Sequence, residues 1–341
     1  MELKFGLDTF GDMQVDENGK PLHAAHVIRN VVEEAVLADS VGIDAFNVGE
    51  HHRDDFAVSS PDTVLAGIAT RTKNITLGTG VTVLSSDDPV RVYERFATID
   101  ALSHGRAEIT AGRGSFIESF PLFGFSLEDY GVLFEEKLQI LSELIKEKPV
   151  TWSGTIRTPL VNQEVYPKTE HGSIPVRVAV GGTPESVVRA ARLGLPLALA
   201  IIGGDPARFA PFSHLYRNRL VEYGHQSLPI SIHSPGHCAE SDELAMEQLW
   251  PHYQALYSRI GRERGWAPTT KEHFINEAQF GSLYVGSPET IARKIVYAMK
   301  EVGAQRFDFK YANGSLPHSY LMKSIELYGT KVIPLVREML T

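Results

Sequence analysis

The chain has 341 residues, of which 43% are hydrophobic and 22% are charged, and its formal net charge is −9. These proportions are typical of a globular protein with a sizeable core and exclude a disordered or fibrous chain. The negative charge argues against a nucleic acid or an anionic membrane surface as a partner. Because Cys238 is the only cysteine, an intrachain disulfide and a paired-thiol redox site are excluded, and redox chemistry would need a cofactor.

The sequence carries no signal for a membrane or for secretion. No apolar run approaches the roughly 18–20 residues that a membrane-spanning helix needs. The start, Met1-Glu2-Leu3-Lys4, lacks the basic-then-apolar order of a secretion signal, so we expect a cytoplasmic protein. No linker rich in Pro, Gly or Ser divides the chain, so residues 1–341 are expected to form one domain.

Short apolar, β-branched runs alternate with amphipathic stretches, which is typical of repeated strand-helix units around a parallel sheet. Strands are expected at Lys4–Thr9, Ala45–Val48, Ile75–Val83, Ala107–Ala111, Val176–Val180, Leu197–Ile201, Ile230–His233 and Phe307–Tyr311. Helices are expected at His26–Val41, Pro61–Thr72, Val90–Ser103, Asp129–Lys146, Pro184–Leu193, Pro206–Tyr223, Ser241–Gly261, Ser287–Val302 and Ser319–Leu340. Eight such units favour a (β/α)8 TIM barrel, although an open doubly wound sheet shows the same alternation.

Two stretches interrupt this repeat. Residues 148–168 contain short β-rich runs and are predicted to form a small hairpin inserted before the fifth strand. Residues 261–283 form a long excursion before the last helix-strand pair. We interpret the excursion as a lid, because long loops in compact domains are usually functional or disordered.

The residues after the fourth and fifth strands have the composition of an anion site. Gly181 and Gly182 allow a ligand close to the backbone, and the hydroxyls of Thr183 and Ser186 flank the first turn of the next helix. An ordinary helix capped by Thr183 explains the same residues without a ligand. In Gly112-Arg113-Gly114-Ser115 the arginine is suited to a bidentate contact with phosphate, but a surface arginine in a glycine-rich turn looks the same.

Two other strand ends carry candidate residues. The second strand ends in Gly49-Glu50-His51-His52-Arg53-Asp54-Asp55. Because neighbouring side chains on an extended segment point to opposite sides, one of His51 and His52 is expected to face the barrel mouth, and the two are not expected to bind one metal. That histidine is either an acid or base near neutral pH or a hydrogen-bonded residue of a polar loop. Gly78 and Gly80 in the third strand favour either the close approach of a flat ring or tight sheet packing.

Together these segments resemble the bacterial luciferase-like family of flavin-dependent monooxygenases. The matching residues span nearly the whole chain in the family's order: Gly42-Ile43-Asp44, Val48-Gly49-Glu50-His51-His52, Arg71-Thr72-Lys73, Leu77-Gly78-Thr79, Pro89-Val90-Arg91, Ser103-His104-Gly105-Arg106, Gly112-Arg113-Gly114, Val165-Tyr166-Pro167-Lys168, Gly194-Leu195-Pro196 and Val285-Gly286-Ser287-Pro288-Glu289. The resemblance implies a (β/α)8 barrel, usually dimeric, that binds FMN at its mouth. The apolar helix expected from Pro61 is a reasonable dimer interface.

The resemblance also implies roles for particular residues. Four would hold the FMN phosphate: Arg113, Gly182, Thr183 and Ser186. Gly80 and Val81 would run beneath the isoalloxazine, where such proteins often have a non-proline cis peptide. The ring and ribityl chain would be bordered by Gly114, Phe116, Val180 and Gly181. His51, the first histidine of the Glu-His-His motif, would assist proton transfer during the oxygen chemistry of the flavin.

The expected activity is that of a two-component FMN-dependent monooxygenase, which uses reduced flavin and O2 to oxygenate a small organic substrate. A separate NAD(P)H:flavin reductase would supply the reduced FMN, since no Gly-x-Gly-x-x-Gly nicotinamide motif follows a strand. A deazaflavin (F420)-dependent oxidoreductase and a non-catalytic flavin-binding protein are alternatives on the same barrel. Light emission is not expected, because Gly112 stands where the light-emitting luciferase subunit has a reactive cysteine.

A metal-dependent barrel hydrolase that uses His51, His52, Asp54 or Asp55 is a further alternative from a different class. Such sites generally need several ligands that converge from different strands. The first strand ends in Leu7-Asp8-Thr9 and offers no paired histidines, so no metal is expected.

Overall fold

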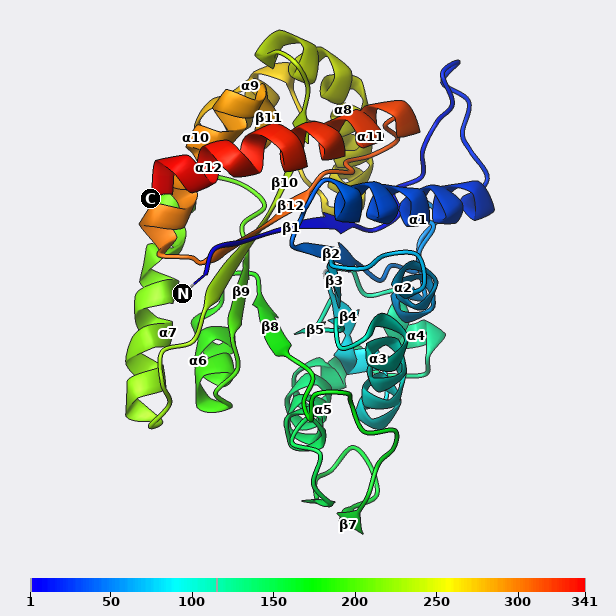
Figure 1. Ribbon diagram of the computed structural model, residues 1–341, viewed down its shortest axis with the longest axis vertical. Helices are drawn as coiled ribbons and strands as arrows, with labels where there is room; N and C mark the ends of the chain where they lie inside the picture. Colours follow the sequence, from blue (N-terminus) through cyan, green and yellow to red (C-terminus); the bar gives the residue numbers. More distant parts are fainter. Residues whose placement is uncertain (1, 115, 341) are drawn as a thin grey trace.

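The computed structural model describes residues 2–114 and 116–340, which wrap a ring of helices around a central sheet (Figure 1). The strands that form the sheet are β1 (Lys4–Thr9), β2 (Ala45–Val48), β3 (Thr76–Thr79), β4 (Thr82–Val83), β5 (Ile109–Gly112), β8 (Val176–Val180), β9 (Leu197–Ala200), β10 (Ile230–Cys238), β11 (Tyr284–Gly286) and β12 (Arg306–Lys310). Their order is β3-β2-β1-β12-β10-β9-β8-β5-β4, and β11 pairs with β10 beyond this path. The pairings within the sheet are parallel.

The sheet closes on itself at β3. This strand and β4 are the two halves of one strand, yet they stand at opposite ends of the pairing order. Leu77 of β3 forms a parallel bridge with Ala107, just before β5, and the Glu108 amide donates to the Leu77 carbonyl at 2.9 Å. Counting β3 and β4 as one strand, eight strands close the ring, so the predicted (β/α)8 barrel is confirmed.

Some predicted strand boundaries were wrong. The third strand, expected over Ile75–Val83, is interrupted between β3 and β4 at the Gly80-Val81 peptide, which is cis. The seventh strand continues beyond His233 to Cys238, although Pro235 and Gly236 predict a break. Pairing with β12 continues through Pro235, because proline keeps its carbonyl acceptor, and β11 pairs with the extension.

The helices that surround the barrel are α1 (Ala24–Ser40), α2 (Pro61–Ala69), α3 (Pro89–Ser103), α5 (Tyr130–Leu144), α6 (Pro184–Arg192), α7 (Ala210–Glu222), α8 (Asp242–Arg264), α10 (Pro288–Val302), α11 (His318–Leu327) and α12 (Ile333–Leu340). Their ends follow ordinary capping chemistry. Asp88 accepts hydrogen bonds from two amides of the first turn of α3, and Gly224, just after α7, has the left-handed φ of 76° predicted for it. A π-helical turn over residues 328–332 joins α11 to α12, so the predicted last helix is nearly continuous.

Two segments extend beyond the repeat. Strands β6 (Val150–Trp152) and β7 (Leu160–Gln163) form an antiparallel hairpin outside the main sheet, at the lower end of the view in Figure 1. The predicted excursion over residues 261–283 is largely helical, because α8 continues to Arg264 and α9 (Lys271–Phe280) follows. Within residues 2–114 and 116–340, no helix is both long and apolar enough to cross a bilayer.

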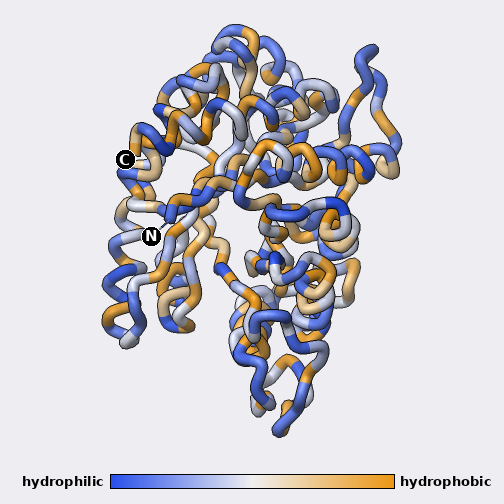
Figure 2. The backbone as a smooth tube through the Cα atoms, viewed as in Figure 1, coloured by the Kyte–Doolittle hydropathy of each residue, from blue (hydrophilic) through white to orange (hydrophobic). Residues whose placement is uncertain are grey.

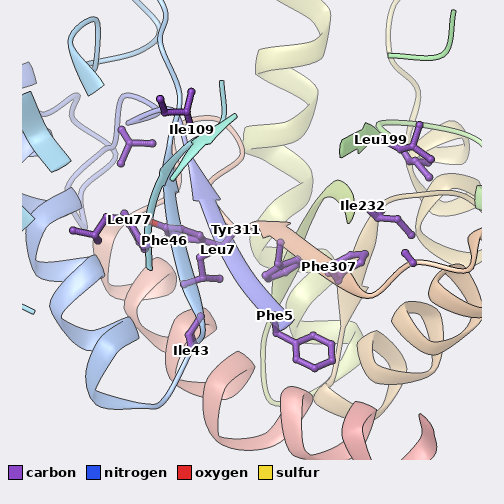
Figure 3. Close-up of a cluster of buried hydrophobic side chains, with 14 of the residues drawn as sticks. Phe5, Leu7, Ile43, Phe46, Leu77, Ile109, Leu199, Ile232, Phe307 and Tyr311 are labelled. Atoms are coloured by element: carbon purple, nitrogen blue, oxygen red, sulfur yellow. The ribbon is translucent and has the colours of Figure 1, made fainter. Parts of the chain in front are cut away.

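Each barrel strand buries apolar side chains on its outer face. Phe5 and Leu7 on β1 are fully buried in the same cluster as Val31 and Ala35 on α1, and Figure 3 shows such side chains along several strands. The helices that cover the strands alternate hydrophobic and hydrophilic residues along the chain (Figure 2). This apolar layer between strands and helices supplies most of the hydrophobic stabilisation of the fold.

The inner face of the barrel is charged. Glu108, Arg177, Arg306 and Asp308, which we call the charged layer, are all buried. Glu108 accepts hydrogen bonds from Arg306 at 2.7 Å and from Arg177 at 3.1 Å. Asp308 accepts hydrogen bonds from the same two arginines at 2.8 and 2.9 Å. The two positive and two negative charges neutralise each other, which offsets the free-energy cost of burying them. The charged layer fills the barrel toward the amino ends of the strands.

Candidate functional site

A cavity of about 410 Å³ lies at the carboxyl ends of the barrel strands, where barrels of this kind bind ligands. Its volume is within the usual range for a small-molecule or cofactor site. The cavity is lined by these residues of the predicted flavin site: His51, Gly80, Val81, Arg113, Gly114, Phe116, Val180 and Gly181. Ser115, which belongs to the same predicted loop, lies outside the described residues.

Beside the cavity, the first turn of α6 meets Arg113 from the loop after β5. Arg113 Nη2 donates to Ser186 Oγ at 3.2 Å, and the Thr183 hydroxyl donates to the same oxygen at 2.7 Å. Arg189, one turn further along α6, approaches Ser186 Oγ at 3.4 Å. We call these four residues the α6 cradle. Gly182, at the entrance to α6, has a φ of 107° that favours glycine.

The α6 cradle has the donor set of a phosphate site. It offers two guanidinium groups, two hydroxyls and the amino end of a helix, all of which favour an anion. Arg189 is also paired with Glu135, at 2.5 Å, whereas Arg113 makes no ion pair with any residue that the structure describes and stacks on the Tyr130 ring at 5.1 Å. The charge of Arg113 is therefore the one that an anionic ligand would neutralise.

Arg189 was not predicted from the sequence as part of this site. The signal was present, because a residue three positions after Ser186 lies on the same face of a helix. Thr183 stands at the N-cap position but makes no side-chain cap hydrogen bond, so the ordinary capped-helix interpretation does not account for its hydroxyl.

Two glycines that line the cavity, Gly80 and Gly112, are packed closely against neighbouring side chains. A Cβ on Gly80 would lie 2.1 Å from Oδ2 of Asp8, and a Cβ on Gly112 would lie 2.6 Å from Cγ2 of Val81. Only glycine fits these two positions without movement of the neighbouring atoms. Tight packing against Asp8 and Val81 therefore accounts for both glycines, and the Gly80-Val81 peptide lines the cavity.

His51 is buried in an aromatic box at the end of β2. Its ring lies 4.5 Å from the rings of Phe10 and Phe56 and 5.1 Å from Phe116. Its Nε2 atom is buried and has no hydrogen-bond partner within the described part of the chain. The adjacent His52 instead contacts Glu50 at 2.9 Å and does not line the cavity.

Burial lowers the pKa of His51 to about 3, and the positive charges of Lys310 and Arg53 add to the effect. The imidazole is therefore neutral at physiological pH and does not titrate near neutral pH, as one of the two interpretations of the sequence required. A neutral imidazole still holds one proton and offers one acceptor nitrogen.

Replacing His51 by glutamine is expected to make the protein less sensitive to mild acid. The unfolded chain protonates this histidine below its ordinary pKa of 6.5, whereas the folded protein does so only near 3, so stability is lost as the pH falls between these values. At about pH 5 this loss amounts to about 2 kcal/mol in the parent protein and is absent from the variant. Urea unfolding of both proteins at about pH 8 and pH 5 measures the difference.

Equal losses in the two proteins would contradict this assignment. The interval above about pH 8 serves as the control, because His51 is neutral there in both the folded and the unfolded chain.

A second polar group faces the cavity from β1, β10 and β12. Nδ1 of His233 lies 2.9 Å from Oδ2 of Asp8. Burial raises the pKa of Asp8, and the neighbouring His233 and Lys310 oppose this shift. Lys310 donates to Asp12 at 3.1 Å and lies 4.5 Å from the Phe10 ring centre. Sequence reasoning did not single out this group, although its members alternate with apolar residues along their strands.

The end of α8 covers the cavity from the solvent side. Tyr257, Ile260 and Trp266 contribute to the lining. Arg53, in the loop after β2, forms ion pairs with Glu263 of α8 at 2.8 Å and with Glu118 at 2.7 Å. These contacts connect the covering segment to two of the loops that surround the cavity.

Within residues 2–114 and 116–340, no cluster of three or more histidine, cysteine or carboxylate side chains could hold a metal ion. His51 is surrounded by phenylalanines, and Asp54 forms an ion pair with Arg259. The described residues therefore give no support to the hydrolase alternative.

The family described as luciferase-like monooxygenase matches residues 9–306. The chain is 25% identical over 343 residues to the alkanal monooxygenase alpha chain of Photobacterium leiognathi, which covers 92% of this chain and 94% of that relative.

Two solved structures share the fold at low identity. The oxygenating constituent of 3,6-diketocamphane monooxygenase from Pseudomonas putida, in complex with FMN, superposes with a TM-score of 0.78 and 17% identity over 98% of each chain. An F420-dependent secondary alcohol dehydrogenase, in complex with an F420-acetone adduct, superposes with a TM-score of 0.74 and 18% identity over 99% of this chain and 100% of that one. The fold is thus shared by proteins that bind either kind of flavin.

Proposed function

The chain belongs to the luciferase-like monooxygenase family, and we propose that it is an FMN-dependent monooxygenase that uses reduced flavin and O2 to oxygenate a small organic substrate. The observation that carries the proposal is the position of the α6 cradle next to a cavity that Gly80 and Val81 line. A phosphate, a linking chain and a planar ring system are the parts of FMN, and the site offers a matching surface for each.

The residues of the site fit this cofactor. Arg113, Thr183, Ser186 and Arg189 would hold the phosphate, with Gly182 allowing its close approach. Gly80 and Val81 would lie beneath the ring, and Gly114, Phe116, Val180 and Gly181 would border the ring and the ribityl chain. When bound, the reduced cofactor supplies the electrons and the reaction with O2.

We assign to His51 the handling of a proton beside the ring. Its low pKa keeps the imidazole neutral, and its buried Nε2 has no partner among the described residues, so this atom is available to the cofactor or to the substrate. Phe10, Phe56 and Phe116 exclude water around the imidazole, which strengthens its polar interactions.

We favour FMN over a deazaflavin because of the charge next to the α6 cradle. F420 carries an acidic tail beyond its phosphate, and such a tail would pass the first turn of α6, where Glu185 is exposed. Repulsion between like charges disfavours that arrangement. FMN ends at its phosphate and avoids the repulsion.

The proposal is tested by titrating the purified chain with FMN and with F420, each in its reduced form, and by following O2 consumption. Binding of reduced FMN, with O2 consumed in its presence, is the expected result. Preferential binding of reduced F420 without O2 consumption would support the deazaflavin alternative instead. Binding of FMN without any turnover over a panel of substrates would favour a non-catalytic flavin-binding protein.

We further propose that a separate NAD(P)H:flavin reductase supplies the reduced FMN. The sequence contains no Gly-x-Gly-x-x-Gly motif after a strand that would bind a nicotinamide nucleotide itself. We also propose a homodimer in which α2 contributes to the interface, as the family resemblance implies.

A further inference from the structure

The cavity holds a second imidazole, His233, that the proposed role of His51 leaves unused. Its Nδ1 lies 2.9 Å from Oδ2 of Asp8, so the carboxylate fixes the ring and keeps a proton at Nδ1. The nitrogen that remains is Nε2, and His233 lines the cavity. A histidine oriented by a carboxylate in this way is equipped to accept a proton from a bound molecule.

Asp8 is buried, and one of its carboxylate oxygens lacks a partner among the described residues. Its side chain is 97% removed from solvent, since only 3% of its surface remains exposed. Its second oxygen, Oδ1, is buried and has no hydrogen-bond partner among the described residues. Buried carboxylate oxygens are normally satisfied, so this atom calls for a donor from a molecule in the cavity.

Phe10 separates the two histidines. The Phe10 ring is stacked on His233 at 6.2 Å with an interplanar angle of 18°, and it meets His51 edge-on at 4.5 Å. The other charged groups near the Asp8 carboxylate are Asp308 and Lys310, and Lys310 is itself paired with Asp12. The two imidazoles thus face the cavity as distinct groups.

The remaining walls are largely apolar and aromatic. Phe56, Phe116, Tyr257, Ile260 and Trp266 line the same cavity as His233. Aromatic side chains favour flat ligands, which stack on them or meet their edges. A ligand that fits both features is planar and carries a hydroxyl that can give up its proton.

We infer that Asp8 and His233 form a substrate-binding pair for a planar phenol or enol, whose hydroxyl hydrogen-bonds to the pair and transfers its proton to Nε2 of His233. The oxygen of the substrate keeps the electron pair of the broken O–H bond, and the imidazolium that forms is stabilised by Asp8. No oxidant takes part in this step. The inference rests on the proposed function for its substrate, and it adds the class of molecule that is oxygenated.

If Asp8 and His233 had a purely structural role, a hydroxyl on the ligand would not change its affinity for the protein. Two probes, 4-nitrophenol and 4-nitroanisole, distinguish the two interpretations. The first carries a hydroxyl group where the second carries a methoxy group. Each probe is titrated into the FMN-loaded protein by calorimetry. Difference absorption spectra, at a pH below the pKa of free 4-nitrophenol, report how much of the bound probe is ionised.

The parent protein is expected to bind 4-nitrophenol about ten- to a hundred-fold more tightly than 4-nitroanisole, the range of a hydrogen bond to a charged partner. The bound phenol is expected to be mainly ionised. His233→Gln and the nearly isosteric Asp8→Asn should each remove most of the preference and the ionisation. His214→Gln, which removes an exposed imidazole on α7 that does not line the cavity, should keep both.

Equal binding of the two probes by the parent protein, binding of neither, or a preference that survives His233→Gln and Asp8→Asn would overturn the inference. If a variant fails to fold, the parent protein's preference and the ionised fraction of its bound phenol still decide the question. FMN affinity is measured separately. A protein that binds FMN without preferring the phenol refutes the inference alone, and one that prefers the phenol without retaining FMN refutes the proposed cofactor.

Discussion

Replacing Arg113 by methionine is expected to weaken FMN binding by about a hundred-fold and to leave riboflavin binding nearly unchanged. Arg113 is the arginine of the α6 cradle that makes no ion pair with a described residue, so its charge is available to the phosphate. Charge-assisted hydrogen bonds contribute about 1.5–3 kcal/mol each, and methionine removes them while preserving much of the side-chain volume. Titration of both ligands into both proteins, followed by flavin fluorescence, measures the change.

Riboflavin is the matched control, because it differs from FMN only in lacking the phosphate. Loss of affinity for both ligands would show that Arg113 contacts the ring or ribityl chain, and no loss for either would contradict the phosphate assignment. Arg219→Met, at a partly exposed position on α7, controls for the change in net charge. Arg113→Lys should restore only part of the affinity, since an ammonium group cannot form the bidentate contact.

Replacing Glu108 by alanine is expected to lower the free energy of unfolding by about 3–5 kcal/mol. Burial raises the pKa of Glu108, but Arg306 and Arg177 outweigh this effect, so the pKa is lowered and the carboxylate is charged. Its removal leaves two buried guanidinium groups to share the single carboxylate of Asp308. Equilibrium unfolding in urea measures the loss.

Glu33→Ala provides the comparison on the surface. Glu33 is paired with Arg71 at 2.7 Å, but both side chains are about half exposed, at 51% and 48%, so the cost should stay below about 1 kcal/mol. Similar losses for the two variants would contradict the importance that we give to the charged layer.

The fold was predictable because its signals are local and repeated. Alternating strand and helix patterns identified the eight units, and Gly224 marked the end of a helix. Two features depended on distant parts of the chain. The extension of β10 past Pro235 is stabilised by β12 and β11, and α8 continues to Arg264 because Glu263 and Arg259 are paired with the loop after β2. Neither contact is visible in a short window of sequence.

The site was predictable only where a strand end met a recognisable motif. Arg113 and Ser186 were expected to share a ligand, and their side chains are hydrogen-bonded in the structure. The pairing of Asp8 with His233 was not predicted, because β1 and β10 lie far apart in the sequence. They are brought together by β12, which pairs with both. The low pKa of His51 follows from three phenylalanines on separate segments, and no spacing rule indicates such an enclosure.

The charged layer also determines how molecules can enter. Since ion-paired side chains fill the barrel toward the amino ends of its strands, we expect a ligand of the cavity to enter from the opposite side, where α6 and α8 lie. If the proposed cofactor binds against Gly80 and Val81, a substrate that entered first would block its site, so we expect the cofactor to bind before the substrate.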